Sequence, residues 1–152
     1  MGGPRSRGPW VIRTAVALMA AGIVSGCAVG TGTLRIADAQ AEIVAVAEEV
    51  LAEAGLRATG PVEAAPLEQC ELRSGGPGLR TSVEVRAPLS DGPGALAEAF
   101  DAAAAVLVAR ELVLVESGVP GTLLGQRDGI TVTIGSDGSR LELDAITGCR
   151  PR

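Results

Sequence analysis

The residue types that are missing from this sequence limit its chemistry. It contains no histidine, lysine or tyrosine, and Trp10 and Phe100 are the only aromatic residues among 152. Histidine is the usual general acid or base near neutral pH, and a serine or cysteine nucleophile normally needs such a neighbour. Paired carboxylates can hydrolyse glycosides, although the aromatic-lined cleft that sugars favour cannot be built here. The composition predicts a protein that is not an enzyme, with no catalytic residue and no cofactor.

Basic residues are scarce in most of the chain. All 13 are arginine, and Arg5, Arg7 and Arg13 precede Cys27, whereas none of the 18 acidic residues does. From Cys27 onward, 10 arginines face 18 acids, a formal charge of −8. Such a segment repels phosphate backbones and anionic headgroups, so we exclude nucleic acid as a partner and electrostatic docking on a membrane. Without histidine or a calcium-loop motif, we expect no metal site.

Long hydrophobic runs are also few, and the longest lies near the amino terminus. Ala15 to Val24 is an apolar run of ten residues that follows the three arginines and precedes the small residues Ser25 and Gly26. A membrane span needs about 20 apolar residues, which makes a permanent transmembrane helix the poorer interpretation. A basic region, a short apolar core and a small-residue exit are typical of a secretory signal peptide. We therefore expect residues 1–26 to be removed.

The exit of this segment reads Val24-Ser25-Gly26-Cys27. It resembles the lipobox of bacterial lipoproteins, in which an aliphatic residue and two small residues precede an obligatory cysteine. The resemblance implies that the Cys27 thiol carries diacylglycerol, that cleavage falls between Gly26 and Cys27, and that Cys27 becomes a new amino terminus open to acylation, for example by palmitate. Two or three acyl chains are enough for stable anchoring. The alternative is an ordinary signal peptide with an incidental cysteine.

The rest of the chain resembles known lipoproteins only in layout. The Ala-, Gly- and Arg-rich, lysine-free composition is typical of a high-GC bacterium, and the arrangement of lipobox, short tether and compact domain is similar to that of small uncharacterised actinobacterial lipoproteins. This resemblance implies a cell-membrane location on the extracytoplasmic face, with the bilayer as a partner through acylated Cys27. It implies no activity.

Three cysteines are an odd number for an exported protein. If Cys27 carries lipid, Cys70 and Cys149 remain, and disulfides persist outside the cytoplasm. The sequence therefore predicts a Cys70–Cys149 disulfide that ties the last strand to the start of the domain. A metal pair or a redox pair is the alternative, but neither histidine nor a C-x-x-C spacing supports it.

Two segments have the three- and four-residue apolar spacing of amphipathic helices. Residues 34–55 form the first, which ends at a predicted C-cap, Gly55. The second is predicted to start at Ser90-Asp91-Gly92-Pro93, with serine or aspartate near the cap. Its apolar stripe would be Leu96, Phe100, Ala103 and Leu107.

Alternating or continuous apolar residues predict the strands. A weak strand at 67–73 is followed by a turn at 74–78 and an alternating strand at 79–87. Residues 112–116 read as a buried strand, which a turn at 118–121 follows. The clearest signal is the hairpin of 130–134 and 141–145 around Asp137-Gly138, with a further tight turn at 126–129.

These elements follow the order α-β-β-α-β-β-β. Strands joined by short turns must be antiparallel, and two apolar-striped helices can cover one face. We therefore expect an α+β fold: a two-layer sandwich in which two helices cover an antiparallel sheet of four to five strands. The predicted organisation is a signal peptide (1–26), a lipidated tether (27–33) and a single α+β domain (34–152).

The function expected from these observations is that of a non-catalytic interaction module at the cell envelope, with an unidentified protein partner. A carrier or binder of an apolar small molecule is the first alternative, and a carboxylate-based hydrolase is the second. A cavity between helices and sheet would favour the carrier, and a closed core with an exposed apolar patch would favour the interaction module.

Overall fold

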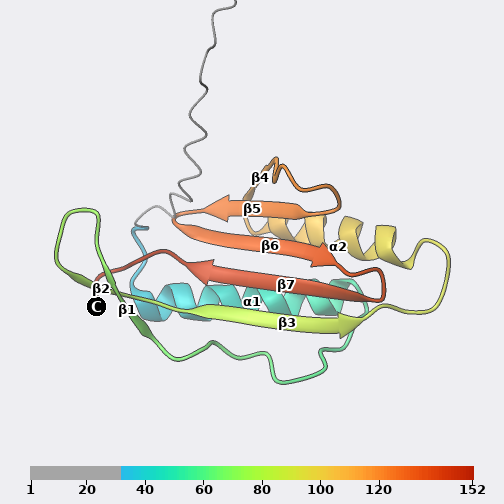
Figure 1. The fold of residues 1–152 in the computed structure, drawn as a ribbon, viewed down its shortest axis with the longest axis horizontal. Helices are drawn as coiled ribbons and strands as arrows, with labels where there is room; N and C mark the ends of the chain where they lie inside the picture. The colour runs from blue at the N-terminus through green and yellow to red at the C-terminus, as the bar shows by residue number, and fades with distance from the viewer. Residues whose placement is uncertain (1–31) are drawn as a thin grey trace, which may run out of the picture.

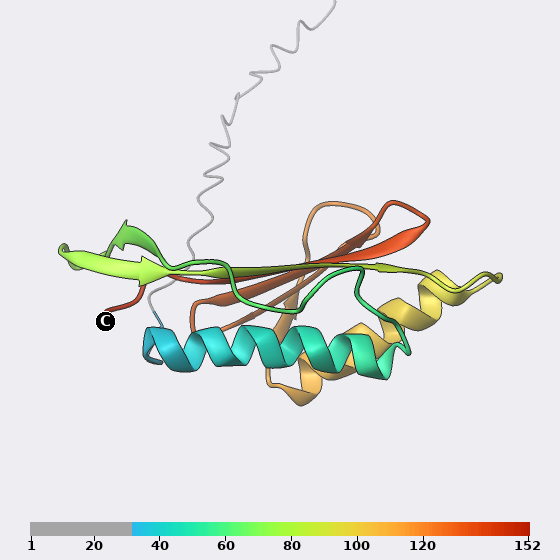
Figure 2. The same ribbon diagram turned by 90° about the horizontal axis from the view of Figure 1, so that it is seen from below.

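The computed structural model describes residues 32–152, so the predicted signal peptide and Cys27 lie outside the described residues. The described elements are α1 (Ile36–Glu53), β1 (Glu68–Glu71), β2 (Pro77–Arg80), β3 (Ser82–Pro88), α2 (Ala95–Ala109), β4 (Val113–Val115), β5 (Leu123–Arg127), β6 (Ile130–Ser136) and β7 (Arg140–Thr147). Both helices lie on the same face of the larger sheet (Figure 1, Figure 2). The expected two-layer α+β sandwich is confirmed.

The larger sheet contains five antiparallel strands in the order β3-β7-β6-β5-β4. Both predicted hairpin turns are present: residues 128–129 join β5 to β6, and residues 137–139 join β6 to β7. Asp128 (φ 45°) and Gly129 (φ 74°) adopt the left-handed conformations that a two-residue hairpin turn needs. The larger sheet therefore has the expected number of strands, whereas β1 and β2 form a separate two-stranded sheet that was not expected.

Small aliphatic side chains fill the space between the helices and the sheet. The core residues are at most 7% exposed, and alanines from α1, α2 and β7 are among them. Gly125 on β5 permits close contact, because a Cβ there would lie 3.1 Å from Leu107 and 3.3 Å from Leu112. Gly125 thus lets the side chains of Leu107 and Leu112 lie close to the backbone of β5.

Helix α1 ends as the sequence predicts. Gly55 adopts a left-handed conformation (φ 65°) directly after the last turn. Its N–H donates to the Ala52 carbonyl at 3.1 Å, and the Leu56 N–H donates to the Leu51 carbonyl at 2.8 Å. This is the Schellman arrangement, which satisfies carbonyls that the end of a helix would otherwise leave without partners.

The predicted start of the second helix is wrong. α2 begins at Ala95 after Gly94, which has a φ of 99°, and no side chain caps it. Residues 90–93 lie in the loop before the helix, so neither Ser90 nor Asp91 acts as the cap. The buried face is also rotated from the expected stripe: Leu96 is exposed and Phe100 is only partly buried. The buried side chains of α2 are those of Ala99, Ala103, Val106 and Leu107.

Two strand predictions also need correction. The strand expected over 79–87 is divided at Thr81 into β2 and β3, and Pro77 and Gly78 belong to β2 rather than to the preceding turn. The strand expected to be buried over 112–116 is the edge strand β4, whose three residues are all exposed. Only Leu112, which precedes β4, is buried.

The two edges of the larger sheet differ. Along β3, residues of the connection from α1 to β1 are hydrogen-bonded to the strand: Thr59 N–H donates to the Arg86 carbonyl at 2.9 Å, and Ala65 N–H donates to the Ser82 carbonyl at 2.8 Å. Figure 1 shows this connection running beside β3. At the opposite edge, β4 pairs with β5 on one side, and no other strand of the described chain pairs with its outer side.

Within residues 32–152, neither helix combines the length and apolar character required to cross a bilayer.

Leu107 and Val108 are adjacent residues of α2 that provide a matched test of this packing. Leu107 is fully buried, whereas Val108 is 59% exposed. We expect Leu107→Ala to lower the free energy of unfolding by about 2–5 kcal/mol, because it removes buried contacts and leaves a cavity. Val108→Ala should change it by about 0.5 kcal/mol or less. Urea unfolding followed by circular dichroism would measure both, and equal losses would contradict the proposed orientation of α2.

Candidate functional site

The end of the domain at which the described chain begins brings together several segments that are distant in sequence. The chain enters at Gly32, and the β5–β6 turn, the β1–β2 hairpin and the carboxyl terminus lie at the same end (Figure 1). We call this the entry end. The opposite end, which we call the far end, contains the β6–β7 turn and the loop that leads into α2. Leu89 N–H there donates to the Ser139 carbonyl at 3.0 Å.

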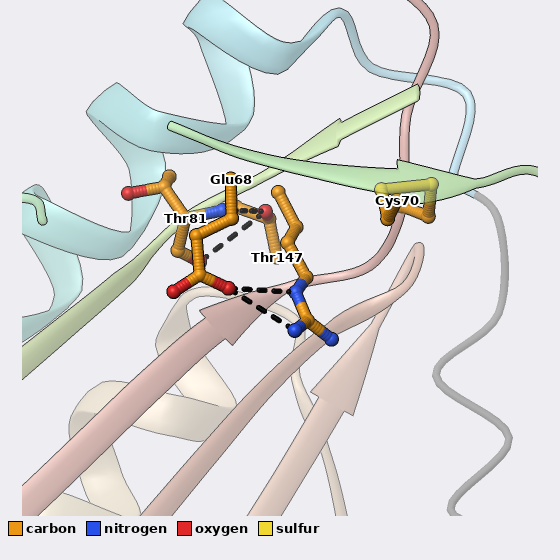
Figure 3. Close-up of a disulfide and its surroundings, with 6 residues drawn as sticks. Glu68, Cys70, Thr81 and Thr147 are labelled. Carbon is orange, nitrogen blue, oxygen red and sulfur yellow. Dashed lines mark hydrogen bonds and ion pairs between the residues drawn. A yellow bond between two sulfur atoms is a disulfide. The ribbon is translucent and has the colours of Figure 1, made fainter. Parts of the chain in front are cut away.

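A disulfide is the covalent feature of the entry end. The sulfur atoms of Cys70 on β1 and Cys149, which follows β7, are bonded, and their Cα atoms lie 5.9 Å apart. The pairing predicted from the cysteine count is therefore present, and Figure 3 shows the disulfide beside the strand that carries Cys70. Gly78, the partner of Cys70 across the hairpin, lies so close to Cys149 that a side chain there would collide with the sulfur.

Two threonines hold the hairpin to the larger sheet. Thr81 N–H donates to Oγ1 of Thr147 at 3.0 Å, and Thr147 N–H donates to the Thr81 carbonyl at 3.0 Å (Figure 3). The Thr81 hydroxyl donates to the Ala65 carbonyl at 2.6 Å. Both residues are buried. These bonds explain why the strand predicted as continuous is divided at Thr81. The Thr81 N–H is bonded to the side chain of Thr147 and not to a backbone carbonyl of a neighbouring strand.

A hollow of about 470 Å³ lies between the hairpin and the larger sheet. Its polar lining includes Glu68 and Arg80, which form an ion pair at 3.1 Å across the hairpin. Both side chains are more than half exposed, so the pair contributes little to stability. The disulfide also lines this hollow. The Glu71 carboxylate also lines the hollow and lies outside this ion pair, so the lining carries a net negative charge.

A cluster of hydrogen bonds holds the beginning of the described chain. The Asp128 carboxylate accepts from Thr33 N–H at 2.7 Å, from Leu34 N–H at 3.1 Å and from the Thr33 hydroxyl at 3.1 Å. Arg150 donates from Nη1 to the Leu34 carbonyl at 2.9 Å and from Nη2 to the Asp128 carbonyl. We call Thr33, Leu34, Asp128 and Arg150 the entry clasp. Thr33, assigned from sequence to a tether, is thus bound to the domain.

The charges of the entry clasp are partly compensated. The Arg150 side chain is fully buried, and its Nη1 lies 3.7 Å from Oδ2 of Asp128, whose side chain is one-quarter exposed. Burial is the largest influence on the Asp128 pKa and raises it, but the hydrogen bonds from Thr33 and Leu34 and the charge of Arg150 outweigh burial, so the pKa is lowered overall. Burial lowers the pKa of Arg150, against the influence of Asp128.

Exposed apolar residues concentrate at the β4 edge. Seven large apolar side chains of the described residues are exposed, and five of them lie between Val108 and Val119. Val113 is 65% exposed and Val119 is 61% exposed. Leu114, Val115 and Val119 line a hollow of about 310 Å³ together with Leu123 and Leu124 of β5. We call Val113, Leu114, Val115 and Val119 the apolar edge.

The uncovered face of the sheet carries acidic residues. Glu84 on β3 and Asp144 on β7 are direct cross-strand partners, and both line a hollow of about 290 Å³. Burial, together with the charge of Glu84, raises the pKa of Asp144. The neighbouring pair, Arg86 and Glu142, forms an ion pair at 3.6 Å. Within the described residues no group of three or more Cys, Asp or Glu side chains could hold a metal ion.

The structure describes two of the six site residues predicted from sequence. Val24, Ser25, Gly26 and Cys27 lie outside the described residues, whereas Cys70 and Cys149 are joined. Sequence reasoning missed the entry clasp and the apolar edge. The turn at Asp128 was predicted, but nothing in the sequence pattern indicates that Arg150 and Thr33 reach it.

Comparisons of the chain with protein-family models, with curated proteins and with solved structures find no match.

The entry clasp predicts a dependence of stability on pH. Because the pKa of Asp128 is lower in the folded protein than in the unfolded chain, its contribution is complete above the unfolded value and is lost as the pH falls through the folded value. At pH 7 we expect Asp128→Asn to cost about 1–3 kcal/mol, because asparagine tolerates the backbone conformation but cannot accept from both N–H groups.

The difference between the wild type and Asp128→Asn should shrink as the pH is lowered from about 5 to about 2. Urea unfolding over this range would measure it. Asp137→Asn is the positive control, because hydrogen bonds from Ser139 lower the pKa of Asp137 to about 2 in the other hairpin turn, and its difference from the wild type should also shrink as the pH falls. A wild-type–Asp128→Asn difference that stays constant with pH would contradict the role assigned to the Asp128 carboxylate.

Proposed function

We propose that this chain is a lipoprotein of the bacterial cell envelope, anchored on the extracytoplasmic face by acyl chains on Cys27, whose domain binds a partner protein without catalysis. The anchor rests on the sequence Val24-Ser25-Gly26-Cys27 after a short apolar run. The interaction role rests on one structural observation: an exposed apolar edge strand beside a closed core.

The two sheet edges support this role. An unpaired edge strand offers a row of backbone N–H and C=O groups to another chain, and folded proteins commonly cover or charge such edges. Here the chain covers the β3 edge, whereas the β4 edge bears Val113, Leu114 and Val115. Addition of a partner strand to β4 would satisfy these backbone groups and remove the apolar side chains from water. The short length of β4 limits the number of such bonds, so side-chain contacts must supply much of the affinity.

A carrier of an apolar molecule is supported less well. The residues between the helices and the sheet are at most 7% exposed and pack against one another in one cluster. The hollows described above lie on the outer face, at the edge or beside the hairpin, and strand and loop residues line them. An apolar ligand would have to displace packed side chains to enter the core.

A carboxylate-based hydrolase is also supported less well. Glu84 and Asp144 lie opposite each other, but on an uncovered sheet face rather than in a cleft that could surround a sugar ring. Like charges opposite each other in a sheet raise a pKa without any catalytic role.

The anchor can be tested by Cys27→Ala. Because stable retention requires acyl chains on this sulfur, we expect the variant to leave the membrane fraction. The double variant Cys70→Ala/Cys149→Ala removes two thiols that carry no lipid in the proposal and should stay in the membrane fraction if it folds. Immunoblots of separated fractions would measure this. Retention of the Cys27→Ala variant would contradict lipid anchoring.

The apolar edge can be tested by Val113→Lys/Val115→Lys, which places charges on an edge strand. If each valine contributes about 1.5 kcal/mol of burial, the variant should weaken partner binding by about a hundredfold. Leu96→Lys is the matched control, because Leu96 is also exposed but lies at the start of α2.

The measurement is photo-cross-linking in intact cells from a probe at Val119, which neither variant changes. We expect an adduct in the wild type and in Leu96→Lys, and its loss in the double variant. Adducts of equal yield in all three proteins, or none in the wild type, would contradict the assignment of the edge. An adduct with a second copy of the chain would show that the edge mediates self-association, and the proposal of a different partner protein would be wrong.

A further inference from the structure

The entry clasp fixes the path of the chain before α1. Gly32 lies against the Asp128 carbonyl and the Arg150 guanidinium so closely that a Cβ would collide with both. Thr33 and Leu34 are then held through both their N–H groups and through the Leu34 carbonyl. The chain is therefore bound to the domain from residue 32 onward, four residues before the first helical residue.

The clasp is itself held by the covalent structure of the entry end. The Arg150 N–H donates to the Leu79 carbonyl at 2.9 Å, and the Leu79 N–H donates to the Arg150 carbonyl at 2.8 Å. The preceding residue, Cys149, is joined to Cys70. Because its side chain is fully buried as well, Arg150 is immobilised through both its backbone and its guanidinium.

We infer that the entry clasp sets the orientation of the domain on the membrane, so that the entry end, with the β1–β2 hairpin and the β5–β6 turn, faces the bilayer. This inference rests on the proposed acylation of Cys27. It assigns a bilayer-facing surface that the lipobox alone does not define.

The reach of the chain supports this orientation. The five residue steps from Cys27 to Gly32 span at most about 17 Å, whereas nine steps from Cys27 to Ile36 would span about 30 Å without the clasp. Strand β7 has eight residues, and a strand of that length extends about 27 Å. With the clasp closed, the chain between Cys27 and its first bound residue is shorter than strand β7. Without the clasp, this connecting chain would be longer than the strand, and either end of the domain could approach the bilayer.

The orientation can be measured with one fluorophore at either end. Ser74 in the β1–β2 turn and Ser90 in the loop after β3 are both exposed. With Cys27 acylated and Cys70 bonded to Cys149, Ser74→Cys and Ser90→Cys each provide a single free thiol for labelling. The full-length lipidated protein would be reconstituted into phosphatidylcholine vesicles that carry acceptor-labelled headgroups, and energy transfer would be compared between the labels.

We expect transfer from position 74 to exceed transfer from position 90 by about threefold, given the reach of the connecting chain when the clasp is closed. Asp128→Asn should bring the two efficiencies close together while the protein stays on the vesicles. Asp137→Asn, the matched change in the far turn, should leave the difference intact. Gly32→Val is a second variant that opens the clasp by collision without replacing a residue of the β5–β6 turn, and it should act like Asp128→Asn.

Each outcome distinguishes this inference from the proposed function. If the wild-type protein does not remain on vesicles, lipid anchoring fails, and the orientation fails with it. If the protein remains bound but both labels transfer equally, the orientation is wrong and anchoring stands. If both clasp variants keep circular dichroism spectra and the Cys70–Cys149 link like those of the wild type, yet preserve the difference, the clasp does not set the orientation.

Discussion

Contacts among buried alanine, valine, leucine and isoleucine side chains hold both helices on one face of the sheet, and the rest of the structure depends on them. A core without large aromatic residues buries enough apolar area only if its layers approach closely, which alanines on the helices and Gly125 on β5 permit. The consequence is a core whose residues are almost completely buried. Little room is left between helices and sheet, so the recognition that we propose would use the outer surface.

The one-sided arrangement also determines which parts of the sheet are available. The connection from α1 returns along β3 and occupies its outer edge, whereas α2 delivers the chain to the opposite edge at β4. On β4, Val113 and Val115 lie opposite Gln126 and Leu124, and Leu114 lies opposite Gly125. Because neighbouring residues of a strand point to opposite faces, this strand is apolar on both faces. Strand β4 therefore lies at the surface although its residues are of the types that usually form a buried strand.

These details explain where sequence reasoning succeeded and where it did not. α1 and the β6–β7 hairpin were predicted because a period of 3.6 or 2 is a local property of the chain. The Cys70–Cys149 pair followed from the cysteine count and not from geometry. β4 was assigned to the interior because an unbroken apolar run has the same pattern at a sheet edge as in its centre. The start of α2 was misplaced because backbone conformation at Gly94, and not a side chain, ends the loop.

The entry clasp belongs to a class of feature that local pattern cannot reveal. Asp128 is 95 residues from Thr33 and 22 from Arg150, and only the completed topology places them together. The sequence shows an aspartate before a glycine, which a hairpin turn already explains. The buried arginine near the carboxyl terminus looks like any other charged residue there. An isolated bridge joins Arg150, which lies beyond β7, to Leu79 of β2, and the sequence alone does not pair these two segments.

The clasp and the apolar edge are neighbours, since Val113, Val115 and Asp128 line one hollow, but β4 extends away from the clasp. Val113 pairs with Gln126, close to the β5–β6 turn, and the strand then runs away from the entry end toward Val115. If the entry end faces the bilayer, β4 rises along the flank of the domain instead of lying between the domain and the lipid. A partner strand could then pair with β4 without moving the anchor. The short chain segment between Cys27 and the clasp, which orients the domain, would therefore not block the edge proposed for recognition.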